Sequence, residues 1–333
     1  MNILIIQTAF LGDIVLSMFL ANEIKHYLHN SKITFLSTHI GKQVAECFKY
    51  IDESICYDKR NIHKGWQGIN AISKKINHEE FDYIFAIHKS FRTSILVSKI
   101  KAKHKIGFDK NSFSFLLDTK IKYKKFIHEV FRNRMLLSSI IDIPKNFNYY
   151  QLVQNNIDCF KNISNKNVFI NNDDIIIAPS SVWNTKVWPK EYYAILTKML
   201  INKEQNIYLI GSKVDIDLCN YISSYSGAVS LAGNTSIAQL LELIRNAKLV
   251  ITNDSSPTHI ASLFNIPTVT IFGSTSSLFG FYPLSEKSIV IENENLFCHP
   301  CNIHGSSKCY RKSFECMKNI KPETVFEKIN DLL

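Results

Sequence analysis

The sequence has no apolar run long enough to span a membrane and no basic segment ahead of its first apolar residues. Residues 1–13 (MNILIIQTAFLGD) are mostly apolar, but Gly12 and Asp13 interrupt them after about a dozen positions, whereas a spanning helix needs about 18 to 20. A secretory signal peptide would also need a positively charged leading segment. We therefore expect neither an export signal nor a transmembrane helix, and a cytoplasmic protein.

Long repeats, low-complexity tracts and the G-x-G-x-x-G pattern are also absent. Without repeats or compositional bias, collagen-like and disordered classes are excluded. Without the glycine pattern, of which only Gly12 is present after the first expected strand, a dehydrogenase-type dinucleotide site is excluded. What remains is a globular chain with 46% hydrophobic and 20% charged residues. Its 333 residues exceed the usual size of one hydrophobic core, so the sequence predicts two domains.

The eight cysteines, with no export signal, indicate a reducing compartment. Half of them follow one another near the end of the chain with the spacing C-x2-C-x7-C-x6-C. Four thiolates in so short a segment can bind a structural zinc ion, but the second spacing is not a second C-x2-C knuckle, so free or bridged thiols are the alternative. We expect no catalytic metal. The four cysteines are Cys298, Cys301, Cys309 and Cys316.

The first half of the chain alternates short β-branched runs with helical patterns. Residues 2–7 (NILIIQ), 33–38 (ITFLST) and 81–88 (FDYIFAIH) are typical of buried strands, and residues 14–28, 41–50 and 66–78 have helical periodicity. Such alternation predicts a parallel sheet covered by helices on both faces.

A polar stretch at 162–174 (NISNKNVFINNDD) has the composition of a linker. After it the alternation resumes, with strands expected at 174–179, 206–211, 249–254 and 268–273 and helices at 191–200 and 236–247, the latter capped by Ser236. We expect an α/β protein with two Rossmann-like, doubly wound lobes. Residues 1–165 would form the first, 170–321 the second, and 322–333 a terminal helix packing back toward the first.

The charge is divided unevenly between the halves. Residues 1–165 hold 24 Lys and Arg and 14 Asp and Glu, so they carry the whole formal excess of +10, whereas residues 166–333 hold 15 of each. Between Lys99 and Arg134 there are 11 basic and 3 acidic side chains. This segment is either a solvated basic face or a surface that attracts an anionic partner, such as a phosphorylated lipid headgroup or nucleic acid.

The first motif with a residue suited to catalysis is QTAFLGDIVLS (7–17). It leads from a strand into a helix and places Asp13 near the beginning of that helix. In open α/β sheets ligands bind at the carboxyl ends of strands. Asp13 can therefore serve as a general base for an acceptor hydroxyl. The alternative is a carboxylate that only caps the helix.

The second motif, APSSVWNTKVWPKEYY (178–193), follows the first strand of the second half. Ser180, Ser181 and Lys186 precede the helix start at Trp188-Pro189, and hydroxyls and an ammonium at a helix N-terminus suit a diphosphate. The alternative is a polar loop held by an aromatic contact.

The third motif is TNDSSPTHIASLFNIPTVTIFGSTSS (252–277), which places polar side chains directly after a buried strand. Carboxylate and hydroxyl groups there can accept from a sugar and meet a phosphate, and the histidine can add a donor, although a lone histidine is usually structural. The residues singled out are Asp254, Ser255, Ser256, Thr258 and His259.

These motifs, in this order, resemble those of the ADP-heptose:lipopolysaccharide heptosyltransferases, glycosyltransferase family 9. The family patterns are T-x-x-x-G-D, P-G-S-x-W-x-x-K-x-W-P, G-x-T-S, N-D-S-G-P-x-H-x-A and P-T-x-x-x-F-G-x-T-S. Residues 88–94 (HKSFRTS), 105–117 (KIGFDKNSFSFLL) and 128–137 (HEVFRNRMLL) are similar to the heptosyltransferase II branch, so the resemblance covers nearly the whole chain. Ser180 and Ser256 stand where the family has glycine.

The resemblance implies a GT-B fold, with the two lobes facing a cleft, and an inverting, metal-independent transfer of heptose from an ADP-sugar that is substrate rather than cofactor. It places Asp13 on the family's base, Lys186 on the phosphate-contacting lysine, and Asp254 with His259 on the sugar and diphosphate motif. Gly233 falls on a glycine beside the nucleotide, and Asp215 is expected near the ribose.

The expected acceptor is a phosphorylated lipid A-core at the cytoplasmic face of the inner membrane, to which the protein would bind peripherally. The acceptor-binding candidates are Arg92, Lys120, Lys122, Lys124, Lys125 and Arg132. Two alternatives stay open. One is a GT-B transferase for another nucleotide sugar, such as one carrying N-acetylglucosamine. The other is a basic nucleic-acid-binding module that stacks bases on aromatic side chains near the basic segment, although we expect no nucleic acid partner.

Overall fold

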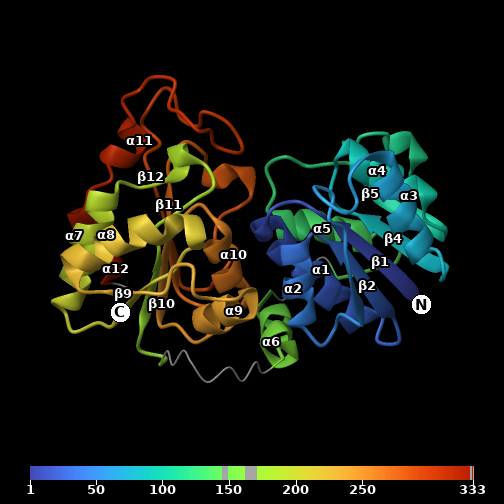
Figure 1. Cartoon of the computed structure of the whole chain (residues 1–333), viewed down its shortest axis with the longest axis horizontal. Helices are drawn as coiled ribbons and strands as arrows, with labels where there is room; N and C mark the ends of the chain where they lie inside the picture. Colours follow the sequence, from blue (N-terminus) through green and yellow to red (C-terminus); the bar gives the residue numbers. More distant parts are fainter. Residues whose placement is uncertain (145–148, 162–170, 331, 333) are drawn as a thin grey trace. The chain divides into compact units, whose positions relative to one another are not determined.

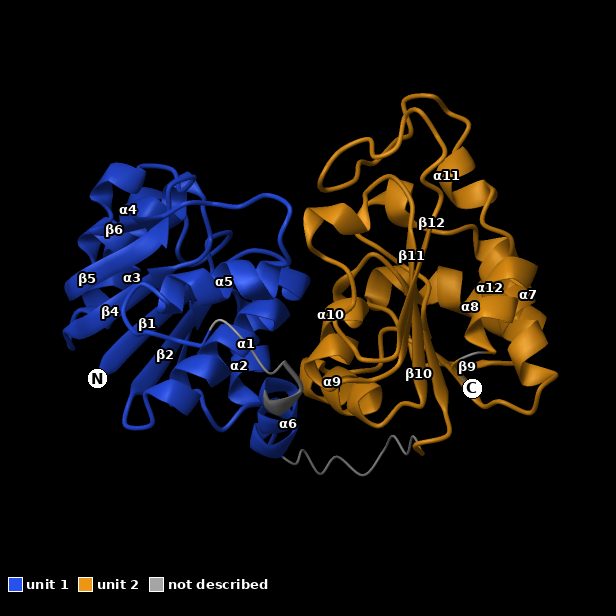
Figure 2. Ribbon diagram, turned by 180° about the vertical axis from the view of Figure 1, so that it is seen from behind, with its two compact units in different colours: residues 1–162 blue, residues 163–333 orange. Residues whose placement is uncertain are grey.

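The chain forms two compact units, residues 1–162 and 163–333 (Figure 2). The structure, a computed structural model, describes residues 1–144, 149–161, 171–330 and 332. Most of the polar stretch at 162–174, and the domain limits expected at 165 and 170, lie outside the described residues.

Unit 1 alternates strands and helices along its whole length (Figure 1). Its elements are β1 (Asn2–Gln7), α1 (Leu11–Tyr27), β2 (Lys32–Ser37), α2 (His39–Glu46), β3 (Glu53–Cys56), α3 (Gly65–Ile76), β4 (Phe81–Ala86), α4 (Phe91–Lys99), β5 (Ala102–Phe108), the 3₁₀ turn η1 (Ser114–Leu116), β6 (Thr119–Ile121), α5 (Glu129–Leu137) and α6 (Tyr149–Cys159).

The six strands of unit 1 form one parallel sheet in the order β3-β2-β1-β4-β5-β6. Alternate residues of β1 point to opposite faces, as strand geometry requires. Leu4 and Ile6 belong to a core with Ile69 and Ile72 of α3, whereas Ile3 and Ile5 are fully buried outside that cluster. The sheet is therefore covered on both faces.

Unit 2 repeats the same alternation. Its elements are β7 (Ile175–Ala178), η2 (Asn184–Lys186), α7 (Lys190–Ile201), β8 (Ile207–Leu209), η3 (Lys213–Asp215), α8 (Ile216–Ser226), β9 (Val229–Ser230), α9 (Ile237–Arg245), β10 (Leu249–Asn253), α10 (Ser256–Leu263), β11 (Thr268–Phe272), η4 (Ser277–Phe279), β12 (Ser288–Glu292), α11 (Glu315–Lys318) and α12 (Pro322–Ile329).

The sheet of unit 2 is also parallel, with the order β12-β11-β10-β7-β8-β9. Numbered within its own unit, each sheet has the order 3-2-1-4-5-6 of the doubly wound nucleotide-binding fold. The expected architecture of two doubly wound α/β lobes is confirmed. Ser236 caps α9 as predicted, and it does so in a capping box with Gln239.

The terminal helix α12 belongs to the core of unit 2. Val325 and Ile329 of α12 are fully buried in the core of unit 2, together with Leu196 and Leu200 of α7. The indole of Trp188 also donates to the carbonyl of Ile320 just before α12 (2.9 Å). α12 thus completes the core of unit 2, and the expectation that residues 322–333 pack back toward the first lobe stays a prediction.

The doubly wound order fixes where ligands can bind. Successive connections leave to opposite sides between β1 and β4 in unit 1 and between β7 and β10 in unit 2, which opens a crevice at the carboxyl ends of these strands. Among the described residues, no helix has the length and apolar character needed to cross a bilayer.

Candidate active site

Each unit places candidate site residues, some predicted and some not, at its own crevice. In unit 1, Asp13 follows β1, and His88 and Lys89 follow β4. In unit 2, Lys186 follows β7, and Asp254 follows β10. The two sets of residues, from separate halves of the sequence, therefore occupy equivalent places in two copies of one topology.

Asp13 lies in the first turn of α1 and remains partly exposed. Burial of its carboxyl, reinforced by the neighbouring Glu129, raises the pKa of Asp13 to about 7, although Lys89 and the backbone N–H of Phe10 oppose the increase. A carboxyl with this pKa can take up a proton near neutral pH, and its partial exposure lets a hydroxyl reach it.

A helix-capping role alone does not account for the raised pKa of Asp13. Its carboxyl does accept from the N–H of Phe10, the N-cap of α1. A carboxylate that only capped a helix would have a lowered pKa, because the helix end favours its charged form. The raised pKa of Asp13 instead marks a group held where its charge is disfavoured, as is common for catalytic acids and bases.

Three charged residues near this crevice were missed by the sequence reasoning. Glu129 begins α5, which packs against α1. The ammonium of Lys89 lies 3.6 Å from the centre of the Tyr123 ring, and Lys59 donates to the carbonyl of Thr8 in the loop after β1 (2.7 Å). Lys59 follows the short edge strand β3, which was not predicted either. A strand assignment there would have pointed to it.

A histidine also lines this crevice. His88 Nδ1 lies 2.7 Å from the hydroxyl of Thr8 and 3.1 Å from that of Thr93. Burial, with help from Lys59 and Lys89, lowers the pKa of His88 to about 4. His88 is therefore neutral at physiological pH and acts as a hydrogen-bonding group rather than a cation.

Five of the six basic residues expected to bind the acceptor are accessible at least in part. Lys120, Lys122, Lys124 and Lys125 are exposed. Arg92 donates to the carbonyl of Lys59 (2.7 Å) and so joins the crevice after β1 and β3.

Arg132 differs from its prediction as a surface cation. It is fully buried, pairs with Glu129, and donates to the carbonyls of Lys124 (2.9 Å), Lys125 (3.0 Å) and Ile127 (2.7 Å). We correct its expected role in acceptor binding, because its guanidinium instead fixes the loop that carries the exposed lysines.

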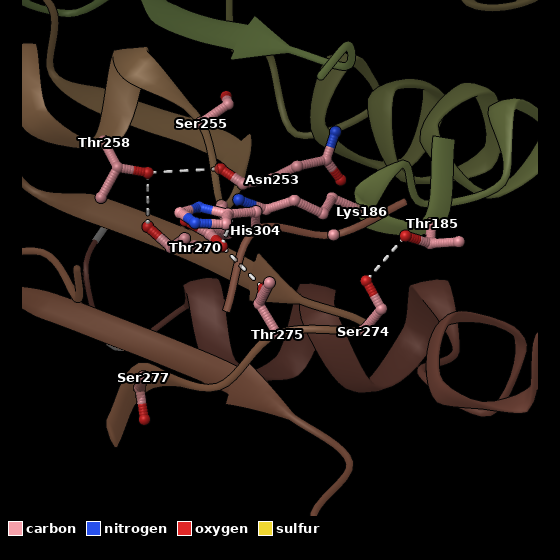
Figure 3. A network of polar contacts seen from close by, with 12 residues as sticks. Thr185, Lys186, Asn253, Ser255, Thr258, Thr270, Ser274, Thr275, Ser277 and His304 are labelled. Atoms are coloured by element: carbon pink, nitrogen blue, oxygen red, sulfur yellow. Dashed lines mark hydrogen bonds and ion pairs between the residues drawn. The ribbon is translucent and has the colours of Figure 1, made fainter. Parts of the chain in front are cut away.

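The crevice of unit 2 is centred on an ion pair. Lys186 Nζ lies 2.6 Å from Asp254 Oδ2, and both side chains are largely buried. The hydroxyl of Thr275, from the loop after β11, donates to the same oxygen (2.7 Å; Figure 3). Segments following β7, β10 and β11 thus meet at one carboxylate, as expected if they surround a common ligand.

Asn253, at the end of β10, ties the neighbouring loop in place. Its amide oxygen accepts from the backbone N–H of Trp188 (3.0 Å), and its amide nitrogen donates to the carbonyl of Pro179 (2.8 Å). Because both ends of the 179–188 loop are fixed, the partly exposed Ser180 and Ser181 have defined positions near Lys186.

The start of α10 supplies the remaining predicted donor residues. Ser255 is its N-cap and Ser256 its first residue, and both are partly exposed. A helix N-terminus presents backbone N–H groups that favour an anion. Thr258 is buried instead. Its hydroxyl donates to the carbonyl of Asn253 (3.3 Å) and lies 3.1 Å from the hydroxyl of Thr270 (Figure 3), so the structure gives it a role in holding the loop.

His259 is buried one turn into α10. In the part of the chain that the structure describes, its Nδ1 has no hydrogen-bond partner. Burial, together with the nearby Lys186, lowers the pKa of His259 to about 3. Buried polar atoms are nearly always paired in native structures. A neutral imidazole with an unpaired Nδ1 near Lys186 is therefore consistent with a side chain that forms a hydrogen bond to a bound ligand.

Asp215 and Gly233 lie together at the carboxyl ends of β8 and β9. The N–H of Gly233 donates to the carbonyl of Gly211 (2.9 Å). Gly233 has a φ of 75°, which favours glycine. Asp215 Oδ2 accepts from both the backbone and the hydroxyl of Ser212 (2.7 Å each). The structure thus places Asp215 in a helix-capping role beside the position expected for the nucleotide.

The loop that carries Thr275 has its own buried support, which the sequence reasoning missed. His299 Nε2 lies 2.8 Å from the carbonyl oxygen of Thr275 and 3.2 Å from Glu292 Oε1. The hydrogen bond to Glu292 raises the pKa of His299. Burial opposes ionisation of Glu292, but bonds from His299 and Ser276 lower its pKa below the usual value. Both pKa shifts favour the ionised form of the pair.

We expect His299→Gln to destabilise the protein by about 2 kcal/mol at about pH 6 and by much less at about pH 9. The pair stabilises the fold above the usual Glu pKa of 4.5, and this stabilisation is lost as the pH rises through the raised pKa of His299. Urea unfolding at both pH values measures the difference. His78→Gln, which removes an exposed histidine 3.9 Å from Glu79, is the control and should change stability little. An equal loss at both pH values would show that the ion pair does not form.

The four cysteines near the end of the chain are all free thiols. Within the described ranges, no three His, Cys, Asp or Glu side chains are arranged to hold a metal ion. The choice between free thiols, bridged thiols and a structural zinc site stays a prediction of the sequence.

Comparisons with known proteins agree with this arrangement of elements. Residues 69–310 match the model of glycosyltransferase family 9 (heptosyltransferase). The lipooligosaccharide heptosyltransferase 2 of Campylobacter jejuni subsp. jejuni serotype O:2 is 26% identical over 348 residues, which cover 100% of this chain and 98% of the relative.

Two solved structures extend the likeness to the fold. The ADP-heptose LPS heptosyltransferase II of E. coli has a TM-score of 0.76 at 21% identity and covers 100% of this chain and 98% of its own. The E. coli heptosyltransferase WaaC, solved with ADP-2-deoxy-2-fluoro heptose, has a TM-score of 0.79 at 16% identity and covers 100% of both chains. The predicted GT-B fold class is confirmed.

Proposed function

The chain belongs to glycosyltransferase family 9, the heptosyltransferases, and from that premise we propose that it transfers heptose from ADP-heptose to an acceptor in the lipopolysaccharide inner core. The observation that carries the chemistry is the raised pKa of Asp13. The residue is partly exposed, and the protein atoms around its carboxyl raise its pKa to about 7. A relative of this chain, E. coli WaaC, has been solved with an ADP-heptose analogue.

Unit 2 binds the donor in this proposal. Lys186 and the N–H groups at the start of α10 meet the diphosphate, because an ammonium and a helix N-terminus both favour negative charge. Asp254 and the neutral His259 contact the sugar and the diphosphate. Gly233 lies beside the nucleotide.

Transfer begins when Asp13 takes the proton from the acceptor hydroxyl. The hydroxyl oxygen forms a bond to the anomeric carbon from the face opposite ADP, while the bond between that carbon and the β-phosphate oxygen breaks. The reaction therefore inverts the anomeric configuration. Lys186 and the helix-end N–H groups stabilise the negative charge that develops on the departing diphosphate.

No metal or cofactor has a step in this mechanism. The positive charge that a divalent cation would supply to a leaving diphosphate comes from Lys186 and from the N-terminus of α10. ADP-heptose is consumed as a substrate.

Unit 1 binds the acceptor, which we propose is a phosphorylated lipid A-core at the cytoplasmic face of the inner membrane. Lys59, Lys89 and Arg92 lie around the crevice that holds Asp13. They and the exposed lysines of the 120–125 segment match an anionic acceptor. Nucleic acid is not the expected partner.

A second donor is favoured by one observation. Ser180 and Ser256 stand where the family pattern has glycine. Ser180 lies in the loop before Lys186, and Ser256 is the first residue of α10, the helix that follows Asp254. The side chains can select a nucleotide sugar other than ADP-heptose. Incubating the protein with ADP- and UDP-sugars and a heptose-deficient core acceptor, with product detected by mass, tests both candidates. Transfer from ADP-heptose alone supports the proposal, and transfer only from UDP-N-acetylglucosamine would replace it.

Glu129→Gln should move the acid limb of the pH profile of kcat/KM toward lower pH by about half to one unit. Glu129 raises the pKa of Asp13 through its negative charge, and removing that charge lets Asp13 lose its proton more readily. Lys89→Met should move the limb the other way, because Lys89 lowers the same pKa. Glu80→Gln, at an exposed carboxylate of unit 1, is the control. A limb that does not move in either variant would rule out Asp13 as the titrating group.

A further inference from the structure

The exposed large apolar side chains of unit 1 gather on the segments that leave the carboxyl ends of its strands. Among the residues that the structure describes, Met1 is the exception. The others are Phe10 after β1, Ile40 after β2, Ile62 and Trp66 after β3, Phe91 after β4, Phe113, Phe115 and Leu116 after β5, and Phe126 after β6. Scattered apolar residues need no explanation, but a set confined to one edge of a sheet marks an interaction surface.

Three of these side chains touch one another. The ring of Phe113 lies 4.9 Å from that of Phe91 and 5.6 Å from that of Phe115, measured between centroids. Phe91 is 52% exposed and Phe115 is 70% exposed. We call Phe91, Phe113 and Phe115 the aromatic cluster. Its rings contact each other, and all three are exposed to solvent.

The aromatic cluster is held by a rigid loop. Phe113 has a φ of 54°, a left-handed conformation that is costly for a bulky residue. The preceding Asn111 donates to the carbonyl of Ala86 at the end of β4 (2.9 Å), and Ser112 donates to the carbonyl of Lys89 from its backbone (3.0 Å) and its hydroxyl (3.1 Å). A loop fixed at this many points, with a strained residue at its tip, keeps an aromatic ring on the surface against its hydrophobic tendency.

Cations surround the aromatic cluster. Lys110 lies in the same loop, and Asp109 Oδ1 accepts from the backbone N–H of Tyr123 (2.9 Å), which brings the lysine-bearing segment alongside. Lys89 contacts Tyr123 from the opposite loop. Arg132, buried beneath, fixes the backbone of Lys124 and Lys125 so that their side chains face outward. Aromatic rings with lysines around them match the interface of an anionic bilayer, where rings sit at headgroup level and lysines meet phosphates.

We propose that the aromatic cluster and the lysines beside it are the surface by which unit 1 docks on an anionic lipid bilayer. This inference rests on the proposed function, because an enzyme reaches an acceptor with a lipid anchor only at a membrane surface. Its physical basis is independent of the transfer reaction. Insertion of the rings gains apolar burial, and the lysines add attraction to acidic headgroups.

Nucleic acid fits this surface less well. Of the aromatic residues that would stack bases there, Phe108 is buried in the core. The ring of Tyr123 already contacts two cations, because Lys89 Nζ lies 3.6 Å and Arg132 Cζ 4.4 Å from its centroid. The remaining exposed rings pack against each other in the aromatic cluster or, for Phe126, lie near the ammonium of Lys125 (5.2 Å).

Co-sedimentation of the full-length protein with vesicles tests the proposal. Wild type should bind vesicles of phosphatidylglycerol and phosphatidylethanolamine and remain in solution with phosphatidylcholine alone. Phe115→Ser should weaken binding about tenfold, and Lys122→Gln with Lys124→Gln about fivefold for each lysine lost at low salt. Tyr225→Ser, which removes a ring of similar exposure (57%) from α8 in unit 2, should bind like wild type. With Phe115→Trp, brominated acyl chains should quench more fluorescence than in wild type.

Equal sedimentation of Phe115→Ser and wild type would overturn the proposal, and so would a loss of oligonucleotide retention in this variant with vesicle binding unchanged. The vesicles contain neither acceptor nor sugar nucleotide, so vesicle binding without any glycosyl transfer would count against the proposed function alone. On a deacylated core acceptor Phe115→Ser should keep wild-type turnover, whereas its KM for an acceptor embedded in vesicles should rise about tenfold.

Discussion

Asp13→Asn is expected to lower kcat by about a thousandfold and to leave donor affinity within about twofold of wild type. An amide cannot take the proton from the acceptor hydroxyl, so the attacking oxygen stays a weak nucleophile. The donor contacts proposed in unit 2 do not involve Asp13. Turnover is measured by the mass of the glycosylated acceptor and donor affinity by calorimetry with the ADP-sugar. Retained turnover would show that Asp13 is not the base.

The stability of the same variant separates chemistry from folding. Because the pKa of folded Asp13 is raised from 3.8 to about 7, the buried carboxyl costs stability as the pH rises through this range, and the cost is complete above about pH 7. Asn at this position still accepts from the N–H of Phe10 but never ionises. Asp13→Asn should therefore unfold at a higher urea concentration than wild type at about pH 8 and not at about pH 4.

A matched control for this substitution lies in unit 2. Asp217 is an exposed carboxylate in the first turn of α8. Asp217→Asn removes a helix-end charge of the same kind as Asp13, so it should lose a few tenths of a kcal/mol of stability and no activity. A similar loss of turnover in both variants would attribute the effect of Asp13→Asn to its helix rather than to catalysis.

The sequence predicted the interior strands of both sheets except β5, and missed the strands at their edges. β1, β2, β4, β7, β10 and β11 are covered on both faces, so nearly every residue is apolar and the run is recognisable. β3, β6, β9 and β12 have one neighbour each and mostly mixed exposure. Their composition resembles that of loops, and β9 has only two residues. β5, with four partly or fully exposed residues at its start, was missed for the same reason.

The candidate site residues that sequence reasoning found are those that lie in a loop or helix start after a recognisable strand. Asp13, Lys186 and Asp254 each follow a recognisable strand directly. Glu129 lies beside Asp13 only because α5 packs on α1. The local sequence does not predict that contact. His299 supports Thr275 through a loop that returns after β12.

Charge counting had a second limit. It treated Arg132 like the lysines around it, although a guanidinium has five donors in a planar fork and can satisfy several carbonyls in a buried position. Arg132 does this with Lys124, Lys125 and Ile127. The exposed lysines and the buried arginine have the same sign of charge and opposite roles.

Lys186→Met should lower kcat/KM for the ADP-sugar about a hundredfold to a thousandfold and destabilise the protein by about 3 kcal/mol. The activity falls because the departing diphosphate loses its nearest cation. The stability falls because Asp254 is left largely buried, with Thr275 still donating to it but no counter-charge. Lys190→Met, at an exposed lysine four positions later, should change neither quantity appreciably.

The double variant Lys186→Met with Asp254→Asn separates the two effects. Asn at 254 has no charge to leave unpaired and still accepts from Thr275, so the free energy of unfolding should return most of the way toward wild type. Activity should stay as low as in Lys186→Met or fall further, because neither the diphosphate cation nor the carboxylate facing the sugar is restored. If turnover returned together with stability, Lys186 would serve only to neutralise Asp254, and the diphosphate would have to be held by the N-terminus of α10 and the serines around it.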